Sequence, residues 1–457
     1  MKTNSKTMIT DLTEGSVAKN LLRFAFPLFA SNLLQAIYNV VDMIVVGQVI
    51  GGAGMSAVSI GGELLHLLTF LAMGFSSAGQ VIISQHVGAG RKEDVKKTIG
   101  TMFTVLLVTS ILLSVICYLL REPILRLLNT PEESYSLTYD YAVTCILGLV
   151  FIYGYNVVSA ILRGMGDSRR PFVFVAVAAV LNIILDIWFV AGLRMQAFGA
   201  ALATVIGQGV SFVASLIYLY RHREAFGFDF RPESFRITGK ALRQLLALGI
   251  PMAIQSAAVN ISKIVLTSWI NVFGVTMSAV GGLYSKLNTM FGVVSNSFVT
   301  AGSAMTGQCI GAEKYERVPK IMRTNFFVML GITIVTGAAL VFKQDAIFRF
   351  FTKDPAVLSS ASIIVLPEIV NFLGATTRAA AFALINGSGN YRLNLCVAIL
   401  DGMIARVGIA GLLGKVLSMG CLGYWYGDAL AGFVPLLIAL CFYASGRWKS
   451  PKELSAK

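Results

Sequence analysis

The chain has 457 residues, 56% of them hydrophobic and only 13% charged, whereas soluble domains carry about 25% charged residues. Apolar segments long enough to cross a bilayer recur from end to end, which excludes a soluble globular protein and predicts a polytopic membrane protein. The formal net charge of +14 is spread over many short polar segments, so we expect contact with the lipid bilayer and no nucleic-acid partner.

The first predicted membrane helix, residues 21–48, contains two residues that a simple anchor does not need. Pro27 interrupts helical hydrogen bonding and predicts a kink. Asp42 lies within the apolar run VVDMIVV, where a carboxylate is costly and commonly functional. We therefore expect a helix hinge at Pro27 and a functional acid at Asp42.

Eleven further apolar segments follow in chain order. A polar stretch at 221–243 divides them, predicting an N-terminal six-helix lobe at 1–220, a cytoplasmic linker, and a C-terminal six-helix lobe at 244–457. The predicted fold class is an all-α membrane protein with twelve transmembrane helices, at 21–48, 56–84, 97–120, 137–162, 171–192, 197–220, 244–270, 277–307, 322–342, 360–386, 393–413 and 419–445.

The distribution of positive charge predicts how the helices are oriented. If the N-terminus is inside, the inner segments carry 26 Lys and Arg residues and the outer loops carry 7. Positive residues accumulate on the cytoplasmic side of membrane proteins. We therefore predict a multi-pass protein of the inner (cytoplasmic) membrane with both termini in the cytoplasm.

The two halves of the chain repeat one another. Because six helices per half is an even number, both halves begin on the same side, which makes them parallel repeats. Transporters of this build bind substrate between the halves and alternate access by rocking one against the other. The matching positions, separated by 222 to 224 residues, are Pro27 and Pro251, Met55–Val58 and Met277–Val280, Ala78–Gly79 and Ala301–Gly302, Gln85-x-x-Gly-Ala and Gln308-x-x-Gly-Ala, and Gly164-x-Gly166 and Gly387-x-Gly389.

This pattern resembles the multidrug and toxic compound extrusion (MATE) family, prokaryotic type. The first helix with Pro27 and Asp42, the two Gln-x-x-Gly-Ala loops and the two Gly-x-Gly turns carry the resemblance, which extends over all twelve spans. The resemblance implies a secondary antiporter that exports small amphipathic or cationic molecules in exchange for H⁺ or Na⁺. It implies no cofactor beyond this coupling ion.

Polar side chains within the first-half helices suggest where the ion binds. Asn182 and Asp186 are four residues apart and share one helix face, and they could converge with Asp42 inside the lobe. Their oxygens suit Na⁺ or a shared proton, although interhelical hydrogen bonding is the alternative. The similarity to the MATE cation site extends the set to Asp42, Asn156, Asn182, Asp186 and Thr204, with no other metal site.

The second half does not repeat these acids. The positions that correspond to Asp42 are Val265 and Leu266, while Asn182 and Asp186 are aligned with Ala405 and Ile409. This half instead carries bases within its helices. Some MATE transporters bind Na⁺ through acids in spans seven and ten, where this chain offers Lys263 and Arg378.

These bases have two interpretations. They contact an anionic group of the substrate, or they form internal salt bridges such as Arg378 with Glu368. Glu63 and Lys286 lie at nearly equivalent places in spans two and eight. We expect these two side chains to pair and to form a gate.

The sequence thus predicts a monomeric antiporter with hinges at Pro27 and Pro251 and no enzymatic activity. A lipid-linked oligosaccharide flippase remains as an alternative because Lys263, Lys286 and Arg378 could line a cationic cleft. A membrane-embedded enzyme is the alternative from another class, although the sequence contains no recognisable catalytic constellation.

Overall fold

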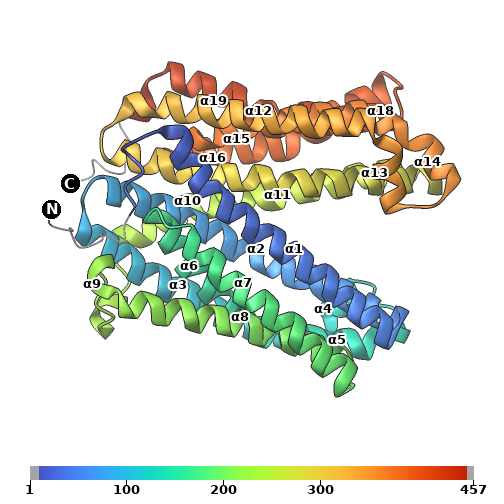
Figure 1. Cartoon of the computed structure of the whole chain (residues 1–457), viewed down its shortest axis with the longest axis horizontal. Coiled ribbons are helices and arrows are strands. Elements are labelled where there is room, and N and C mark those ends of the chain that lie inside the picture. The colour runs from blue at the N-terminus through green and yellow to red at the C-terminus, as the bar shows by residue number, and fades with distance from the viewer. Residues whose placement is uncertain (1–9, 450–457) are drawn as a thin grey trace. The chain divides into compact units, whose positions relative to one another are not determined.

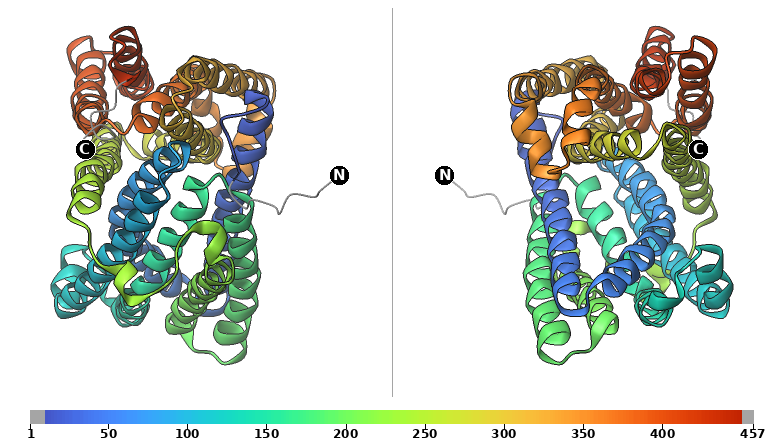
Figure 2. Two further views of the ribbon diagram at one scale, coloured as in Figure 1. Left: turned by 90° about the vertical axis from the view of Figure 1, so that its left-hand side faces the viewer. Right: turned by 90° about the vertical axis from the view of Figure 1, so that its right-hand side faces the viewer.

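A computed structural model describes residues 10–449, which form two compact units of helices (Figure 1). The first unit contains Phe26–Gly249, and the second contains Asp11–Ala25 together with the chain from Ile250 onward. Seen from either end in Figure 2, the helices of each unit have roughly aligned axes, with the chain running in alternating senses along them. This alignment is what a bilayer imposes, because only helices or closed barrels satisfy their backbone hydrogen bonds in hydrocarbon.

In the first unit, α2 packs against α5, α6 and α3, while α8 packs against α7, α5 and α6. Its elements are most of α1 (Val17–Ile50), α2 (Gly52–Gly88), α3 (Lys92–Leu119), α4 (Arg121–Leu127), α5 (Glu132–Leu147), α6 (Leu149–Gly164), α7 (Arg169–Asp186), the π-helix η1 (Ile187–Gly192), α8 (Gln196–Arg221), α9 (Arg223–Phe226), η2 (Pro232–Phe235) and the start of α10 (Gly239–Asn271).

In the second unit, α15 lies at the centre and packs against α11, α12, α18 and α19. Beyond the rest of α10, the elements are α11 (Val275–Gly311), η3 (Tyr315–Arg317), α12 (Val318–Phe342), α13 (Gln344–Phe351), α14 (Pro355–Ala361), η4 (Ser362–Ile364), α15 (Val365–Gly387), α16 (Tyr391–Ile399), η5 (Leu400–Ala405), α17 (Arg406–Gly411), η6 (Leu412–Val416), α18 (Cys421–Ala431), α19 (Val434–Ala444) and η7 (Arg447–Lys449).

The predicted twelve-helix all-α fold is confirmed. Among residues 10–449, ten helical segments are long and apolar enough to cross a membrane. An eleventh is the pair α5 and α6, which is bent by 46° at Gly148 and corresponds to the predicted span 137–162. The twelfth is α11, which has 37 residues but a more polar composition.

The internal repeat extends to backbone geometry. Gly51 and Gly274 precede α2 and α11 with φ of 83° and 95°, and Gly166 and Gly389 have φ of 87° and 69°. Side chains other than glycine rarely adopt this region, which explains why glycine stands at these turns in both halves.

Both repeats also bring two helices into close contact at one glycine. A Cβ on Gly164 of α6 would lie 2.9 Å from the backbone oxygen of Gln80, and one on Gly387 of α15 would lie 3.0 Å from that of Ser303. Small residues at such crossings allow helix backbones to approach each other in a membrane.

The division between the units falls beside both predicted hinge prolines. α1 passes from the second unit to the first between Ala25 and Phe26, and α10 passes from the first to the second between Gly249 and Ile250. Pro27 and Pro251 are buried inside these two helices. Each proline removes one helical hydrogen bond, so each unit begins next to a weakened point of a shared helix.

The predicted linker docks on the first unit through Asp229. Its carboxylate accepts hydrogen bonds from Lys96 Nζ at 2.9 Å and from Ser234 Oγ at 2.5 Å. The backbone then lies so close to α3 that a Cβ on Gly100 would be 1.7 Å from the Ser234 carbonyl oxygen. The linker therefore follows a defined path over α3.

Candidate functional site

Asp42 lies in the middle of α1, and its side chain is turned into the first unit. It is only 5% exposed, and its Oδ1 atom has no hydrogen-bond partner among residues 10–449. Tyr141 and Cys145 of α5, which belong to a buried apolar cluster, lie within electrostatic reach of this carboxylate. A buried carboxylate with an unused oxygen is costly to keep, which marks Asp42 as functional.

Asp186 is the second acid of the same site. It is fully buried at the end of α7, and its Oδ1 atom also has no hydrogen-bond partner in the described chain. Asp42 and Asp186 are close enough to interact electrostatically. The helix then continues as the π-helix η1, a local widening that is common at functional sites.

Asn182 and Thr204 connect the second acid to α8. In the orientation that satisfies both ends of the Asn182 amide, its nitrogen donates to Asp186 Oδ2 at 3.3 Å and its oxygen accepts from the Thr204 backbone N–H at 3.2 Å. The Thr204 hydroxyl lies 3.5 Å from the amide. Four of the five predicted residues, Asp42, Asn182, Asp186 and Thr204, are therefore brought together.

Asn156 is not part of this group by contact. It lies on α6 and is partly buried, and its amide donates to the carbonyl of Ile152 in its own helix at 2.9 Å. Within residues 10–449, we find no hydrogen bond between Asn156 and either acid. Its predicted role as a cation ligand would require the side chain to turn away from this bond.

Among residues 10–449, no positive side chain neutralises the two acids. None of the ion pairs found among residues 10–449 includes Asp42 or Asp186. Tyr38, one helical turn before Asp42 on α1, is also near both carboxylates and lies against Gln208 of α8. The site offers carboxylate, amide and hydroxyl oxygens, so it can take up a proton or a hard cation such as Na⁺.

The corresponding helix crossing of the second unit holds an ion pair. Arg406 of α17 donates to Asp428 of α18, and the two residues are 22 positions apart, as are Asn182 and Thr204. Both the arginine and the aspartate are buried. The offset here is therefore 224, so Arg406 replaces Asn182, and Ala410 replaces Asp186.

This result corrects the sequence alignment, which paired Asn182 and Asp186 with Ala405 and Ile409. The π-helix η5 lies just before Arg406 and takes one more residue per turn than an α-helix, which accounts for the changed offset. The Gly402 carbonyl, which lies in η5, accepts a hydrogen bond from the Ser262 hydroxyl of α10.

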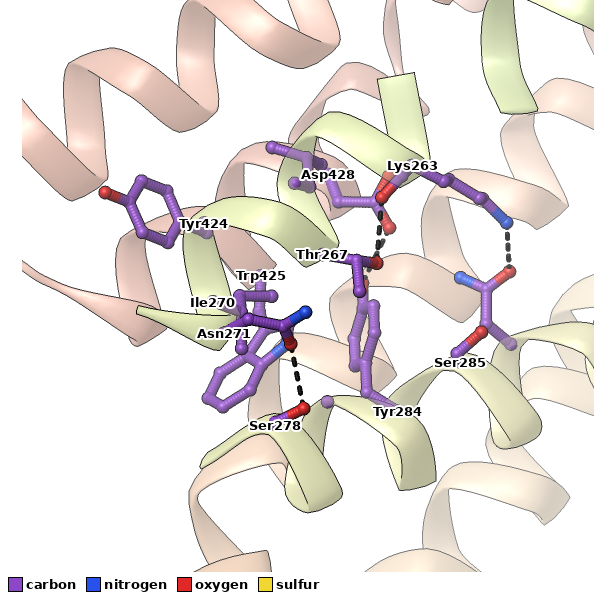
Figure 3. A pocket seen from close by; sticks show the side chains of 13 residues that line it. Lys263, Thr267, Ile270, Asn271, Ser278, Tyr284, Ser285, Tyr424, Trp425 and Asp428 are labelled. Atoms are coloured by element: carbon purple, nitrogen blue, oxygen red, sulfur yellow. Dashed lines mark hydrogen bonds between the residues drawn. The ribbon is translucent and has the colours of Figure 1, made fainter. Parts of the chain in front are cut away.

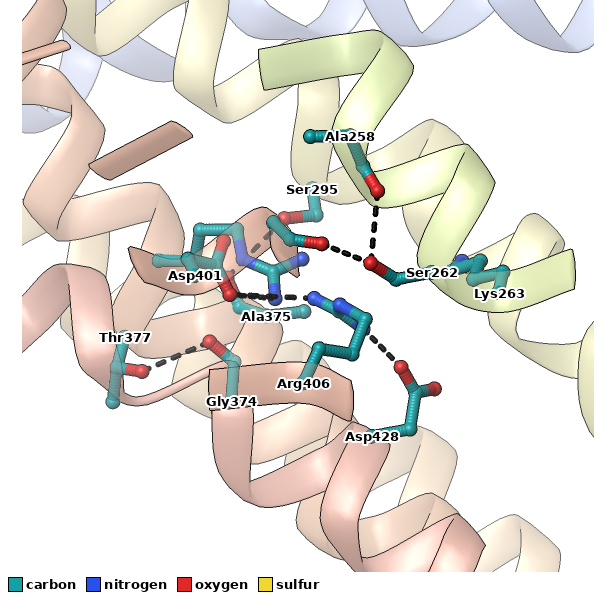
Figure 4. A network of polar contacts seen from close by, with 12 residues as sticks. Ala258, Ser262, Lys263, Ser295, Gly374, Ala375, Thr377, Asp401, Arg406 and Asp428 are labelled. Carbon is teal, nitrogen blue, oxygen red and sulfur yellow. Dashed lines mark hydrogen bonds and ion pairs between the residues drawn. The ribbon is translucent and has the colours of Figure 1, made fainter. Parts of the chain in front are cut away.

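Arg378 also pairs with an acid of this network. Its Nη2 atom lies 3.7 Å from Asp401 Oδ1, and Arg406 Nη2 lies 3.3 Å from the same oxygen (Figure 4). The predicted partner of Arg378, Glu368, was wrong. Glu368 is fully buried near Asp428 and Lys263, but no ion pair of the described chain includes it.

Lys263 lies beside this network and borders a pocket within the second unit (Figure 3). Its ammonium donates to the amide oxygen of Asn288 at 3.0 Å. The Asp428 carboxylate is engaged elsewhere, because its Oδ2 atom accepts from the Tyr284 hydroxyl at 3.1 Å. Lys263 therefore has a neutral hydrogen-bond partner and no ion pair in the part of the chain that the structure describes.

Glu63 and Lys286 are exposed on α2 and α11, respectively. No ion pair found in residues 10–449 includes either of them, and their role as a gate stays a prediction.

Sequence reasoning missed Asp428. An aspartate in the apolar run of the last span was a sufficient signal, because acids within membrane helices are commonly functional or paired.

Comparison with known proteins agrees with this architecture. The MatE family model matches residues 27–188 and 251–408. "Probable multidrug resistance protein YoeA" of Bacillus subtilis is 26% identical, with 97% of each chain covered. "Probable multidrug resistance protein YpnP" of the same species is 27% identical, over 98% of this chain and 99% of that protein.

Solved structures share the fold. An outward-facing multidrug resistance MATE transporter has a TM-score of 0.89 at 21% identity, with 99% of this chain and 100% of that chain covered. A transporter from Pyrococcus furiosus, described as having a binding pocket of reverse polarity, has the same TM-score, identity and coverage. With the twelve-helix repeat and a family match that covers both halves, the chain belongs to the MatE family of multidrug and toxic compound extrusion transporters, which are not enzymes and need no cofactor.

Proposed function

We propose that this transporter exports small amphipathic or cationic molecules in exchange for H⁺ or Na⁺, and that Asp42 and Asp186 take up the coupling ion. The observation that carries this proposal is a pair of buried, interacting carboxylates, each with an oxygen that has no hydrogen-bond partner among residues 10–449. An arriving H⁺ or Na⁺ satisfies these oxygens and removes the repulsion between the two acids.

Asn182 and Thr204 complete the proposed site. The Asn182 amide is held between Asp186 and Thr204, so its position depends on α7 and α8 together. Binding of a cation therefore strengthens contacts among α1, α7 and α8. An ion shifts a conformational equilibrium only if it binds one state better than the other, and this three-helix site changes its affinity when α1 moves.

The proposed movement of α1 occurs at Pro27. Asp42 lies 15 residues after the proline on the same helix, within the first unit, whereas residues 11–25 belong to the second unit. Bending at Pro27 changes the direction of α1 on the two sides of the proline without unfolding the helix, and we propose that this bend is linked to the occupancy of the site at Asp42. Pro251 has the equivalent position in α10, and we propose the same hinge role for it.

The cellular setting of the proposal follows from loop charge. We propose an inner-membrane monomer with both termini in the cytoplasm, because the predicted inner segments carry 26 of the 37 Lys and Arg residues. Accessibility of single cysteines introduced into the 221–243 linker, tested in intact cells and in inverted vesicles, measures this orientation.

Transport by purified protein tests the coupling proposal. Proteoliposomes are given separate H⁺ and Na⁺ gradients, and uptake of the cationic dye ethidium is followed by fluorescence. We expect one gradient to drive transport by the wild type, and Asp42→Asn and Asp186→Asn to remove that coupling. Asp140→Asn, an exposed acid on α5, is the matched control. Undiminished gradient-driven transport by both site variants would remove the coupling role.

A further inference from the structure

Two short helices, one in each unit, repeat the same pattern. α4 follows α3 directly and lies at the end of the first unit away from α9 (Figure 1), while α13 follows α12 at the end opposite to η3. The two segments correspond at an offset of 223 residues, since both read acid-x-Ile-apolar-Arg-apolar-apolar, from Glu122 to Leu128 and from Asp345 to Phe351.

The two segments also share one pattern of burial. Leu125 and Phe348 are only 1% and 2% exposed, and Leu125 packs into an apolar cluster that includes Cys117 of α3. Two positions later, Leu127 and Phe350 are 81% and 83% exposed. Residues two apart lie about 200° around a helix, so one apolar side chain is turned into the unit and the other is turned away from it.

The exposed apolar surface continues that of the membrane helices. A single exposed apolar residue is ordinary, but here both repeats keep a large one at the same position. Leu119, the last residue of α3, is 69% exposed, and Phe342, the last residue of α12, is 80% exposed. α3 and α12 are among the segments long and apolar enough to cross a membrane. Leu127 and Phe350 therefore lie just beyond the ends of helices that lipid covers.

An arginine stands directly before each exposed apolar residue. Arg126 and Arg349 are both exposed, and none of the ion pairs found among residues 10–449 includes either of them. A guanidinium matches the geometry of a phosphate group, and its long stem can lie along apolar surface. A short amphipathic helix that combines such residues suits the boundary between lipid headgroups and acyl chains.

We propose that α4 and α13 are interfacial anchors. Leu127 and Phe350 enter the acyl region of the leaflet at this end of each unit, and Arg126 and Arg349 contact the phosphate groups of its phospholipids. In the orientation proposed above, this is the outer leaflet. Each unit thus has its own contact with the headgroup layer, and the inference does not depend on the proposed export function.

Spin labels on single cysteines measure the depth of each helix. Full-length protein carrying Leu127→Cys or Phe350→Cys is labelled and reconstituted into phosphatidylcholine vesicles. The exposed Cys396 and Cys441 are first changed to alanine, and the other four cysteines are buried. Collisions of the label with oxygen, which concentrates among acyl chains, and with a water-soluble nickel complex report its depth.

We expect the labels at 127 and 350 to lie about 5–10 Å into the boundary between headgroups and acyl chains. Glu122→Cys and Asp345→Cys, exposed positions turned about 140° away on the same helices, are matched controls that should meet more of the nickel complex. Labels at 127 and 350 that are as accessible to this complex as one at Glu233, in the exposed linker, would overturn the proposal. Labels protected from both reagents, with spectra that broaden as the ratio of protein to lipid rises, would assign the surface to a second copy of the chain and overturn it as well.

A second arm tests the arginines. Arg126→Glu repels phosphate and should move the label at 127 out of the acyl region, whereas Arg126→Lys should leave its depth unchanged. The unfolding temperature in detergent should stay close to wild type for both, because the side chain is exposed, which separates a change of depth from a folding defect. An unchanged depth in Arg126→Glu would contradict the phosphate contact.

Discussion

At one helix crossing, the two units place different chemistry on equivalent backbone positions. The first unit has Asn182 on α7 facing Thr204 on α8, and the second has Arg406 on α17 facing Asp428 on α18. In the first unit a neutral pair holds Asp186 in place, while in the second the residues form a closed ion pair. Duplication therefore preserved the contact and changed what the contact can bind.

The two units also differ in where their buried acids lie and in whether arginines pair with them. The positions of Asp42 and Asp186 are occupied in the second unit by Leu266 and Ala410, which are buried apolar residues. Asp401 and Asp428, which are present only there, are neutralised by arginines. In the described chain, Asp42 and Asp186 of the first unit thus have no ion-pair partner, whereas Asp401 and Asp428 of the second unit pair with buried arginines.

The largest expected effect comes from breaking the ion pair of the second unit. Arg406→Asn leaves Asp428 buried without its counter-ion, which destabilises a protein by about 3–5 kcal/mol. The double variant Arg406→Asn with Asp428→Thr recreates the neutral pair of the first unit and should recover much of this loss. Thermal unfolding in detergent measures both. A single variant as stable as wild type would contradict the structural role of the pair.

A smaller loss is expected from adding volume at the same crossing. A Cβ on Gly427 of α18 would lie 2.2 Å from the Ala410 Cα atom, so Gly427→Ala must separate α17 and α18 and should cost about 1–3 kcal/mol. Gly209→Ala on α8 is the matched control, since the nearest atom there is 3.7 Å away. Equal unfolding temperatures for the two variants would show that this crossing is not tightly packed.

Removing the hydroxyl of the first unit's pair should have a functional effect instead of a structural one. Thr204→Val keeps the shape of the side chain and removes one oxygen, a loss of about 0.5–1.5 kcal/mol. We expect the ion concentration that half-activates dye transport to rise about two- to tenfold. The unfolding temperature should stay close to wild type. Unchanged ion dependence would exclude Thr204 from the cation site.

The smallest effect concerns the linker and its dependence on pH. The Ser234 hydroxyl and the Lys96 ammonium lower the pKa of Asp229 below its ordinary range. A lowered pKa means that the carboxylate stabilises the docked linker at neutral pH and that this support is lost only as pH falls through the lowered value.

Hydrogen exchange of residues 227–238 checks this expectation. Protection in the wild type should persist at about pH 4, the ordinary pKa of an aspartate, and Asp229→Asn should reduce protection at neutral pH. Loss of wild-type protection already at about pH 4 would contradict the assigned cause.

Much of the fold could be predicted from the sequence, because bilayer thickness requires long apolar helices and the repeated motifs reveal the duplication. The convergence of Asp42, Asn182, Asp186 and Thr204 was also predicted, since i, i+4 spacing and membrane burial restrict where polar side chains can lie. The Arg406–Asp428 pair was not. One extra residue accommodated by the π-helix η5 shifted the alignment by one position, and local helix widening leaves no reliable sequence signal.

Ion binding by the purified transporter tests the central claim most directly. Isothermal titration with Na⁺, and proton release measured with a pH indicator when ethidium is added, are compared for the wild type, Asp42→Asn, Asp186→Asn and the control Asp140→Asn. The two-acid site predicts binding or release of the coupling ion by the wild type and Asp140→Asn, and none by either site variant. Undiminished ion binding when both Asp42 and Asp186 are replaced would contradict it.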